Sequence, residues 1–148
     1  MLAHGAAGVT AVDVGYGQLD YTLRNDPRVE VIERTNARTM GMDVAPGPYD
    51  LITVDVSFIS LTLVIPNLLP RLRPGGLLLA LVKPQFEVGR KDVGKGGVVR
   101  DQRLIDQAVA KVQEAMASQG LKLLGRCASP IKGPKGNQEV FVLARKEG

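Results

Sequence analysis

Three ionisable residues stand where predicted β-strands begin or end. Asp55 ends the apolar run 49–55, Lys83 follows the apolar run 77–82, and Glu139 begins the last predicted strand. Open α/β sheets bind ligands outside the carboxyl ends of their strands, so Asp55 and Lys83 would face one cleft if their strands are neighbours. A lysine flanked by two carboxylates is held cationic and fixed in direction. Such a group can position a hydroxyl nucleophile and take its proton late in a reaction.

The same residues also have purely structural explanations. Lys83 on its own is explained by a side chain that carries its charge out of the core to water. Together with the carboxylates it would equally form a buried structural ion pair. Asp13 ends the first predicted strand, where an acid either caps a turn or accepts hydrogen bonds from ribose hydroxyls. The chain has no phosphate-binding GxGxxG loop, which argues against a dinucleotide cofactor.

Strands and helices alternate along the chain and would position these residues. Helices are predicted within 18–24, 61–72 and 101–120, and strands at 9–14, 29–32, 49–55, 77–82, 121–128 and 140–144. This order predicts an α/β fold with a mostly parallel sheet and an antiparallel last strand. The run 77–82 is expected to be buried on both faces, with a turn at 73–76 before it. Residues 84–100 are expected to form a long loop without secondary structure.

Composition excludes several classes of protein. The chain has 148 residues, of which 45% are hydrophobic and 23% charged, as in one ordinary globular domain. A single cysteine and a single histidine, Cys127 and His4, leave no disulfide framework and no metal site of the His/Cys type. No apolar run approaches the roughly 20 residues that span a bilayer, and the start does not resemble a signal peptide. A cytoplasmic location is therefore expected.

Positive charge is concentrated in the second half of the chain. Residues 1–70 hold 4 Lys or Arg and 8 Asp or Glu, whereas residues 71–148 hold 15 and 7. Such asymmetry marks a polyanion-binding face or, equally, a solubilising surface. Two Gly-rich loops carry the cations that would contact the phosphates of such a polyanion: Arg90, Lys91, Lys95, Lys132 and Lys135.

Five stretches together resemble a known family. They are residues 11–19 (AVDVGYGQL), 33–38 (ERTNAR), 55–61 (DVSFISL), 82–87 (VKPQFE) and 136–139 (GNQE). In these stretches the chain is similar to the TlyA (haemolysin A-like) family, which belongs to the FtsJ-like ribose 2′-O-methyltransferases. The match runs nearly from end to end.

The resemblance implies a Rossmann-like, S-adenosylmethionine-dependent enzyme that acts on ribosomal RNA or a ribosomal subunit. The catalytic residues it implies are Asp55, Lys83 and Glu139. Those it implies for the cofactor are Asp13 at the ribose, Thr35, Asn36 and Ala37 beside the adenine, and Asp55. No metal is implied. The segment after the third strand is Asp55-Val56-Ser57-Phe58 rather than the Asp/Asn-Pro-Pro-aromatic motif of base amino methyltransferases, which favours a hydroxyl target.

The chain also departs from the family pattern. The family's N-terminal RNA-binding domain, first catalytic lysine, first strand and Gly-rich cofactor loop have no counterpart here, so residues 1–148 are expected to form a single, partial methyltransferase domain. The absent strand would leave two strand edges unpaired, through which a homodimer could form. Two other hypotheses stay open. One is a non-catalytic RNA-binding remnant, in which the five cations of the Gly-rich loops contact RNA phosphates. The less favoured one is a membrane-acting haemolysin, and the lack of a spanning segment argues against it.

Overall fold

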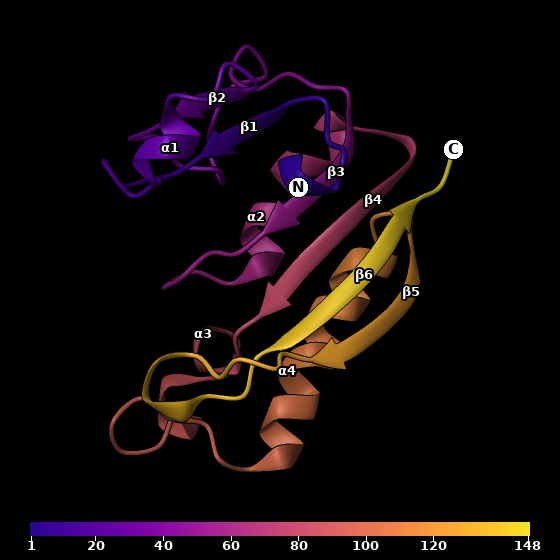
Figure 1. The fold of residues 1–148 in the computed structure, drawn as a ribbon. Helices are drawn as coiled ribbons and strands as arrows, with labels where there is room; N and C mark the ends of the chain where they lie inside the picture. The colour runs from indigo at the N-terminus through magenta and orange to yellow at the C-terminus, as the bar shows by residue number, and fades with distance from the viewer. The chain divides into compact units, whose positions relative to one another are not determined.

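Two separate sheets organise the chain. The computed structural model describes residues 1–148 and divides them into two compact units, residues 1–46 and 47–148 (Figure 1). The expectation of a single domain stays a prediction.

The first unit is built around a short parallel pair of strands. After a 3-10 turn at Leu2–His4, β1 (Val9–Val12) pairs with β2 (Val29–Ile32) in a parallel register that sets Val12 opposite Ile32. The connection contains α1 (Tyr21–Arg24), which begins where the Asp20 carboxylate accepts the Thr22 N–H at 2.8 Å. The β-branched residues of both strands explain their extended conformation.

The second unit is a four-stranded sheet in the order β3-β4-β6-β5. Its strands are β3 (Tyr49–Val54), β4 (Leu72–Val82), β5 (Leu121–Ala128) and β6 (Val140–Lys146). The pair β3-β4 is parallel, and β6 runs antiparallel to both of its neighbours. The predicted fold class, a mostly parallel sheet with an antiparallel last strand, is therefore confirmed.

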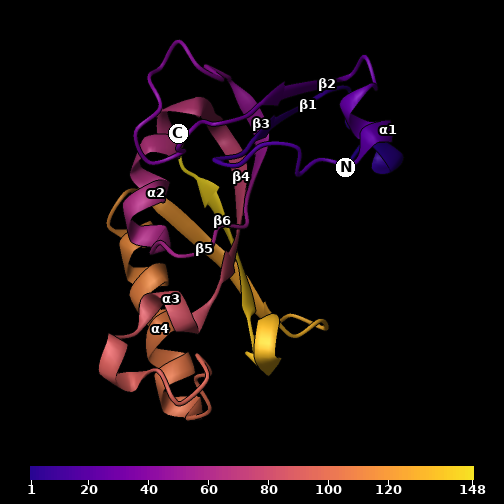
Figure 2. The same cartoon turned by 90° about the vertical axis from the view of Figure 1, so that its left-hand side faces the viewer.

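The helices of the second unit lie on one face of its sheet (Figure 2). They are α2 (Leu61–Leu68), the single turn α3 (Pro84–Glu87) and α4 (Gln102–Ala117), with 3-10 turns at Leu69–Arg71, Arg90–Asp92 and Pro134–Gly136. The helix predicted within 101–120 is α4, and its apolar stripe packs inward; the buried members of the stripe are Ile105, Ala108, Val109, Val112 and Met116. This stripe and the apolar side chains of α2 and β4 make the core of the unit.

Several sequence-based expectations were wrong in detail. The strand expected at 77–82 starts at Leu72 and continues through the expected turn, with a change of register between its pairings to Tyr49 and Leu51. Leu77 and Leu79 are only half-buried, because the helices of this unit cover one face of the sheet. The segment expected to be a plain loop contains α3 and a 3-10 turn.

We predict that Met116→Ala lowers the free energy of unfolding by about 2–5 kcal/mol, because it leaves a cavity at a fully buried position of α4. Urea denaturation measures this loss. Glu114→Ala, on the exposed side of the same helix, is the control and should stay within about 0.5 kcal/mol of the parent. Equal stabilities for the two variants would contradict the packing described here.

Candidate active site

An ion pair joins the carboxyl ends of β3 and β4. The parallel register sets Val54 opposite Ala80, so the segments that follow β3 and β4 leave the sheet at the same edge. There Lys83 Nζ lies 2.6 Å from Asp55 Oδ1. The lysine side chain is only 13% exposed, whereas that of Asp55 is 68% exposed. The pair thus has a fixed, largely buried cation and a carboxylate that is open to solvent.

Ser57 supplies a second partner for the same lysine. Its Oγ lies 3.0 Å from Lys83 Nζ. Ser57 does not cap α2, because Ser60 fills that position, with its Oγ accepting the Thr62 N–H at the start of the helix. A lysine ammonium has three N–H donors. Asp55 and Ser57 take two of them, which leaves the third for an external acceptor.

Glu139 lies at the same edge of the sheet but has different partners. The β4-β6 register pairs Val82 with Val140, so Lys83 and Glu139 are the next residues on adjacent strands. The buried Glu139 carboxylate accepts a hydrogen bond from Gln85 Nε2 at 3.1 Å, and it forms no ion pair with Lys83. Of the two expected carboxylates, only Asp55 touches the lysine directly.

Gly133 makes the room in which the Glu139 carboxylate lies. A Cβ added to this glycine would stand 2.2 Å from Glu139 Oε1, so no larger residue fits without moving that carboxylate. The Gln85 side chain, which holds the other side of Glu139, has its own Oε1 buried without a hydrogen-bond partner. The position of Glu139 is therefore set by its neighbours, not by the lysine.

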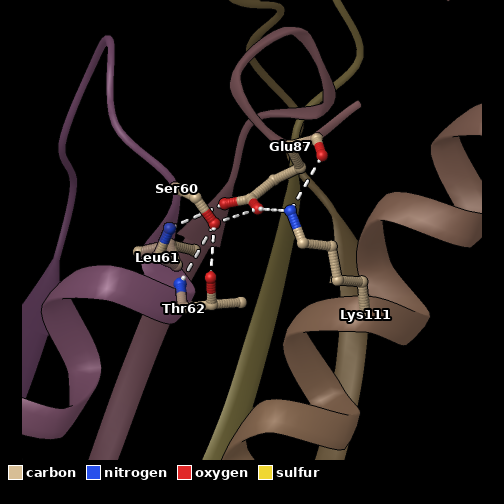
Figure 3. A network of polar contacts seen from close by, with 5 residues as sticks. All are labelled: Ser60, Leu61, Thr62, Glu87 and Lys111. Atoms are coloured by element: carbon tan, nitrogen blue, oxygen red, sulfur yellow. Dashed lines mark hydrogen bonds and ion pairs between the residues drawn. The ribbon is translucent and has the colours of Figure 1, made fainter. Parts of the chain in front are cut away.

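A second buried carboxylate, Glu87, joins the two segments of the site that follow β3 and β4 (Figure 3). Its side chain is 1% exposed. Its Oε2 accepts the Ser60 hydroxyl at 2.6 Å and its Oε1 accepts the Leu61 N–H at 2.8 Å. Lys111 of α4 donates to Glu87 Oε2 at 3.2 Å and to its backbone carbonyl at 2.9 Å. The carboxylate thus satisfies donors at the start of α2 while the α4 lysine balances its charge.

Glu87 closes a loop of contacts around the ion pair. The segment from Asp55 to Ser60 leaves β3, and the segment from Lys83 to Glu87 leaves β4. They are joined at one end by the β3-β4 pairing and at the other by Glu87, with the Lys83–Asp55 contact between. Because both ends are fixed, the ion pair has little freedom to change its geometry.

Phe58 is an exposed aromatic residue beside this pair. It has φ +63°, a left-handed conformation that is rare for a bulky residue, and it is 91% exposed. Its ring centroid lies 5.0 Å from that of Phe86 at an interplanar angle of 52°. Strained backbone of this kind concentrates at functional sites. The role of Phe58 was not predicted, because nothing in the sequence distinguishes an exposed phenylalanine from a core one.

Four of the five residues expected at the cofactor lie in the first unit, at the carboxyl ends of β1 and β2, whereas the fifth, Asp55, belongs to the second unit. Asp13 follows β1, and its backbone carbonyl accepts the Thr35 N–H at 3.0 Å. The Asp13 Oδ1 atom accepts the Gly15 N–H at 2.6 Å, which leaves Oδ2 open to an external donor such as a ribose hydroxyl. Asn36 is exposed in a turn in which its Oδ1 accepts the Arg38 N–H, and Ala37 follows it half-buried.

A further acid, Glu33, fixes the neighbouring turn. Its Oε1 accepts the Gly17 N–H at 2.7 Å and forms an ion pair with Arg24. The hydrogen bond from Arg24 is the main cause that lowers the pKa of Glu33 below its usual range, with the Gly17 amide contributing in the same direction. The turn that follows Asp13 is therefore held by a carboxylate that stays ionised at neutral pH.

All five cations expected at RNA are exposed and lie in two loops of the second unit. None of them forms an ion pair. No group of three or more His, Cys, Asp or Glu side chains is arranged to hold a metal ion. The helices are all too short or too polar to cross a bilayer.

Comparison with known proteins decides the family. Residues 1–146 match the model of the FtsJ-like methyltransferases. The chain belongs to the FtsJ-like methyltransferase family. It is 48% identical over 147 residues to the 16S/23S rRNA (cytidine-2′-O)-methyltransferase TlyA of Mycobacterium tuberculosis, an alignment that covers 99% of this chain and 55% of that protein. The resemblance to TlyA drawn from five motifs is thereby confirmed.

Solved structures agree with this assignment of the FtsJ-like family. A structure from Streptococcus thermophilus, described as a hemolysin, superposes on this chain with a TM-score of 0.94 at 40% identity. The match covers 99% of this chain and 54% of that one. A structure from Listeria monocytogenes, described as an S-adenosylmethionine-dependent methyltransferase, has a TM-score of 0.69 at 16% identity and covers 99% of this chain and 84% of that one. At this identity the likeness shows the fold alone. The chain spans about half the length of the curated relatives it matches.

We predict that Glu87→Ala lowers the free energy of unfolding by about 2–6 kcal/mol, because the buried Leu61 N–H and the part-buried Ser60 hydroxyl lose their acceptor at about 1–3 kcal/mol each. Glu87→Gln is the matched variant. It keeps one acceptor oxygen for the Leu61 N–H and should lose about half as much. Chemical denaturation measures both, and an Ala variant within about 0.5 kcal/mol of the parent would show that this carboxylate does not hold the loops.

Proposed function

We propose that this chain is the methyl-transferring part of an enzyme that uses S-adenosylmethionine to methylate a ribose 2′-hydroxyl of ribosomal RNA. One observation carries the proposal: Lys83 is fixed by Asp55 and Ser57 and has one N–H donor left, at the edge of the sheet where ligands of α/β folds bind. A cationic hydrogen-bond donor at that edge is able to bind a hydroxyl oxygen. Membership of the FtsJ-like family and the name of the Mycobacterium relative support the same reaction and substrate.

The protein's own residues have two tasks in this reaction, which are to orient the hydroxyl and to accept its proton. S-adenosylmethionine, when bound, supplies a methyl group on a positively charged sulfur. Lys83 donates a hydrogen bond to the ribose oxygen and so directs a lone pair of that oxygen to the methyl carbon. A ribose oxygen that takes up this methyl group would hold a strongly acidic proton. Because the Lys83 ammonium already carries three protons, it could take this proton only while passing one of its own to Asp55. The exposed Asp55 carboxylate would then release that proton to water.

The remaining site residues have supporting roles in this proposal. Glu139 places a buried carboxylate, held by Gln85, at the same edge of the sheet as Lys83. Asp13 offers Oδ2 to the ribose hydroxyls of the cofactor. Three further residues form the turn after β2 that we assign to the adenine: Thr35, Asn36 and Ala37. Asp55, as the acid after β3, is assigned to the cofactor as well as to the pair.

We predict that Lys83→Ala lowers the rate of methyl transfer by about 100-fold or more while S-adenosylmethionine affinity changes little, because the lysine orients the hydroxyl and not the cofactor. Transfer of a labelled methyl group to ribosomal RNA measures the rate, and calorimetric titration measures the affinity. Lys122→Ala, at an exposed lysine of β5, is the control. A rate of methyl transfer equal to the parent's in the Lys83→Ala variant would contradict the catalytic role assigned to Lys83.

We further predict that Phe58→Ala weakens binding of substrate RNA by about 1–3 kcal/mol, since an exposed aromatic ring beside the proposed nucleophile site is suited to stacking on a base. Phe58→Trp preserves a stacking surface and should retain most of the affinity. Fluorescence anisotropy with a labelled ribosomal RNA fragment measures both variants. Unchanged RNA affinity in the Ala variant would remove this ring from the substrate site.

A further inference from the structure

A buried asparagine links the two basic loops of the second unit. Asn137 is 3% exposed and lies in loop 129–139, yet it bonds to the backbone of loop 88–100. Its Oδ1 accepts the Val99 N–H at 3.0 Å, and its Nδ2 donates to the Gly97 carbonyl at 2.9 Å. One side chain therefore satisfies a donor and an acceptor of a loop that is 38 to 40 residues away in sequence.

The same asparagine also shapes its own loop. Its Nδ2 contacts the Pro134 carbonyl at 3.3 Å, and its backbone carbonyl accepts the Gly133 N–H at 2.9 Å. These contacts enclose the turn Pro134–Gly136, in which Lys135 has φ +61°. A lysine seldom adopts this left-handed conformation, so the surrounding contacts must hold it there.

At this link a cation of one loop lies against the backbone of the other. A Cβ placed on Gly97 would stand 3.7 Å from Lys135 Nζ, so the ammonium group of one loop lies against the backbone of the other. The facing loop forms a tight turn between Gly94 and Val98 that presents Lys95 to solvent. Both loops lie at the same end of the unit (Figure 1). Neither lysine has an acidic partner.

We infer that Asn137 makes the two loops into one preformed surface for the sugar-phosphate backbone of the substrate RNA. This inference rests on the proposed function and adds the device that organises its RNA contacts. Exposed, unpaired lysines on glycine-rich backbone suit closely spaced phosphates. Holding them in place before binding avoids the entropy cost of ordering two loops separately. Asn137 stands two residues before Glu139, so the surface begins beside the proposed active site.

The test measures RNA binding by the full chain, with no cofactor, using a fluorescein-labelled ribosomal RNA stem-loop at several salt concentrations. Asn137→Ala leaves the net charge unchanged and should weaken binding about tenfold at low salt, because the two loops no longer act as one multivalent surface. Gln138→Ala is the matched control. Its side chain bonds only to carbonyls of its own segment, at Ser129 and Glu139, and its loss should change affinity less than about threefold.

Two exposed variants keep the test decisive if Asn137→Ala unfolds. Lys95→Gln and Lys135→Gln should each reduce the slope of log affinity against log salt concentration by about the amount that one phosphate contact contributes. The double variant should reduce it by about the amount of two contacts. If only one loop's lysine alters the slope, or if a folded Asn137→Ala binds like the parent, the single-surface inference is overturned. A parent chain that fails to bind this RNA at low salt would overturn the proposed RNA substrate itself.

Discussion

The parallel pairing of β3 with β4 is the constraint on which the candidate active site depends. Parallel strands end at the same edge of a sheet, and here the register sends Asp55 and Lys83 out of that edge within 2.6 Å of each other. The antiparallel neighbour β6 brings Glu139 to the same edge from the opposite direction. The ionisable groups therefore converge because of sheet topology, although they are far apart in sequence.

Buried polar side chains then fix the loops that continue from these strands. Glu87 ties the start of α2 to the turn after β4, Gln85 holds Glu139, and Asn137 ties the two basic loops. A buried polar group is costly unless it is satisfied, so each of these contacts specifies one loop arrangement over its alternatives. Most of the buried polar residues of the second unit gather at the end of the sheet that carries the proposed chemistry.

Sequence alone predicted the elements that rest on local patterns. Periodicity and β-branched runs predicted the helix α4 and the strands at 29–32 and 121–128. The rule for strand ends predicted that Asp55 and Lys83 converge. The first residue of β4 and the presence of α3 were missed, because pairing to β3 and the Glu87 contacts decide them.

The roles of Ser57, Phe58, Glu87 and Asn137 were missed for the same physical reason. Each depends on a partner 26 or more residues away or on an unusual backbone angle, and neither leaves a local pattern. Pairs of glycine and lysine in the loops suggested phosphate contacts, but only the fold shows that one asparagine joins the two segments. Long-range polar contacts are thus the part of the site that single-sequence reasoning could not supply.

The most direct measurement of the central claim is the position of the transferred methyl group. Ribosomal RNA methylated by the purified protein with labelled S-adenosylmethionine is digested with alkali, which cleaves RNA only where a free 2′-hydroxyl can attack the adjacent phosphate. The account predicts label in an alkali-resistant dinucleotide, because a 2′-O-methyl group blocks that cleavage. Label in mononucleotides would place the methyl group on a base and would contradict the role assigned to the Lys83–Asp55 pair.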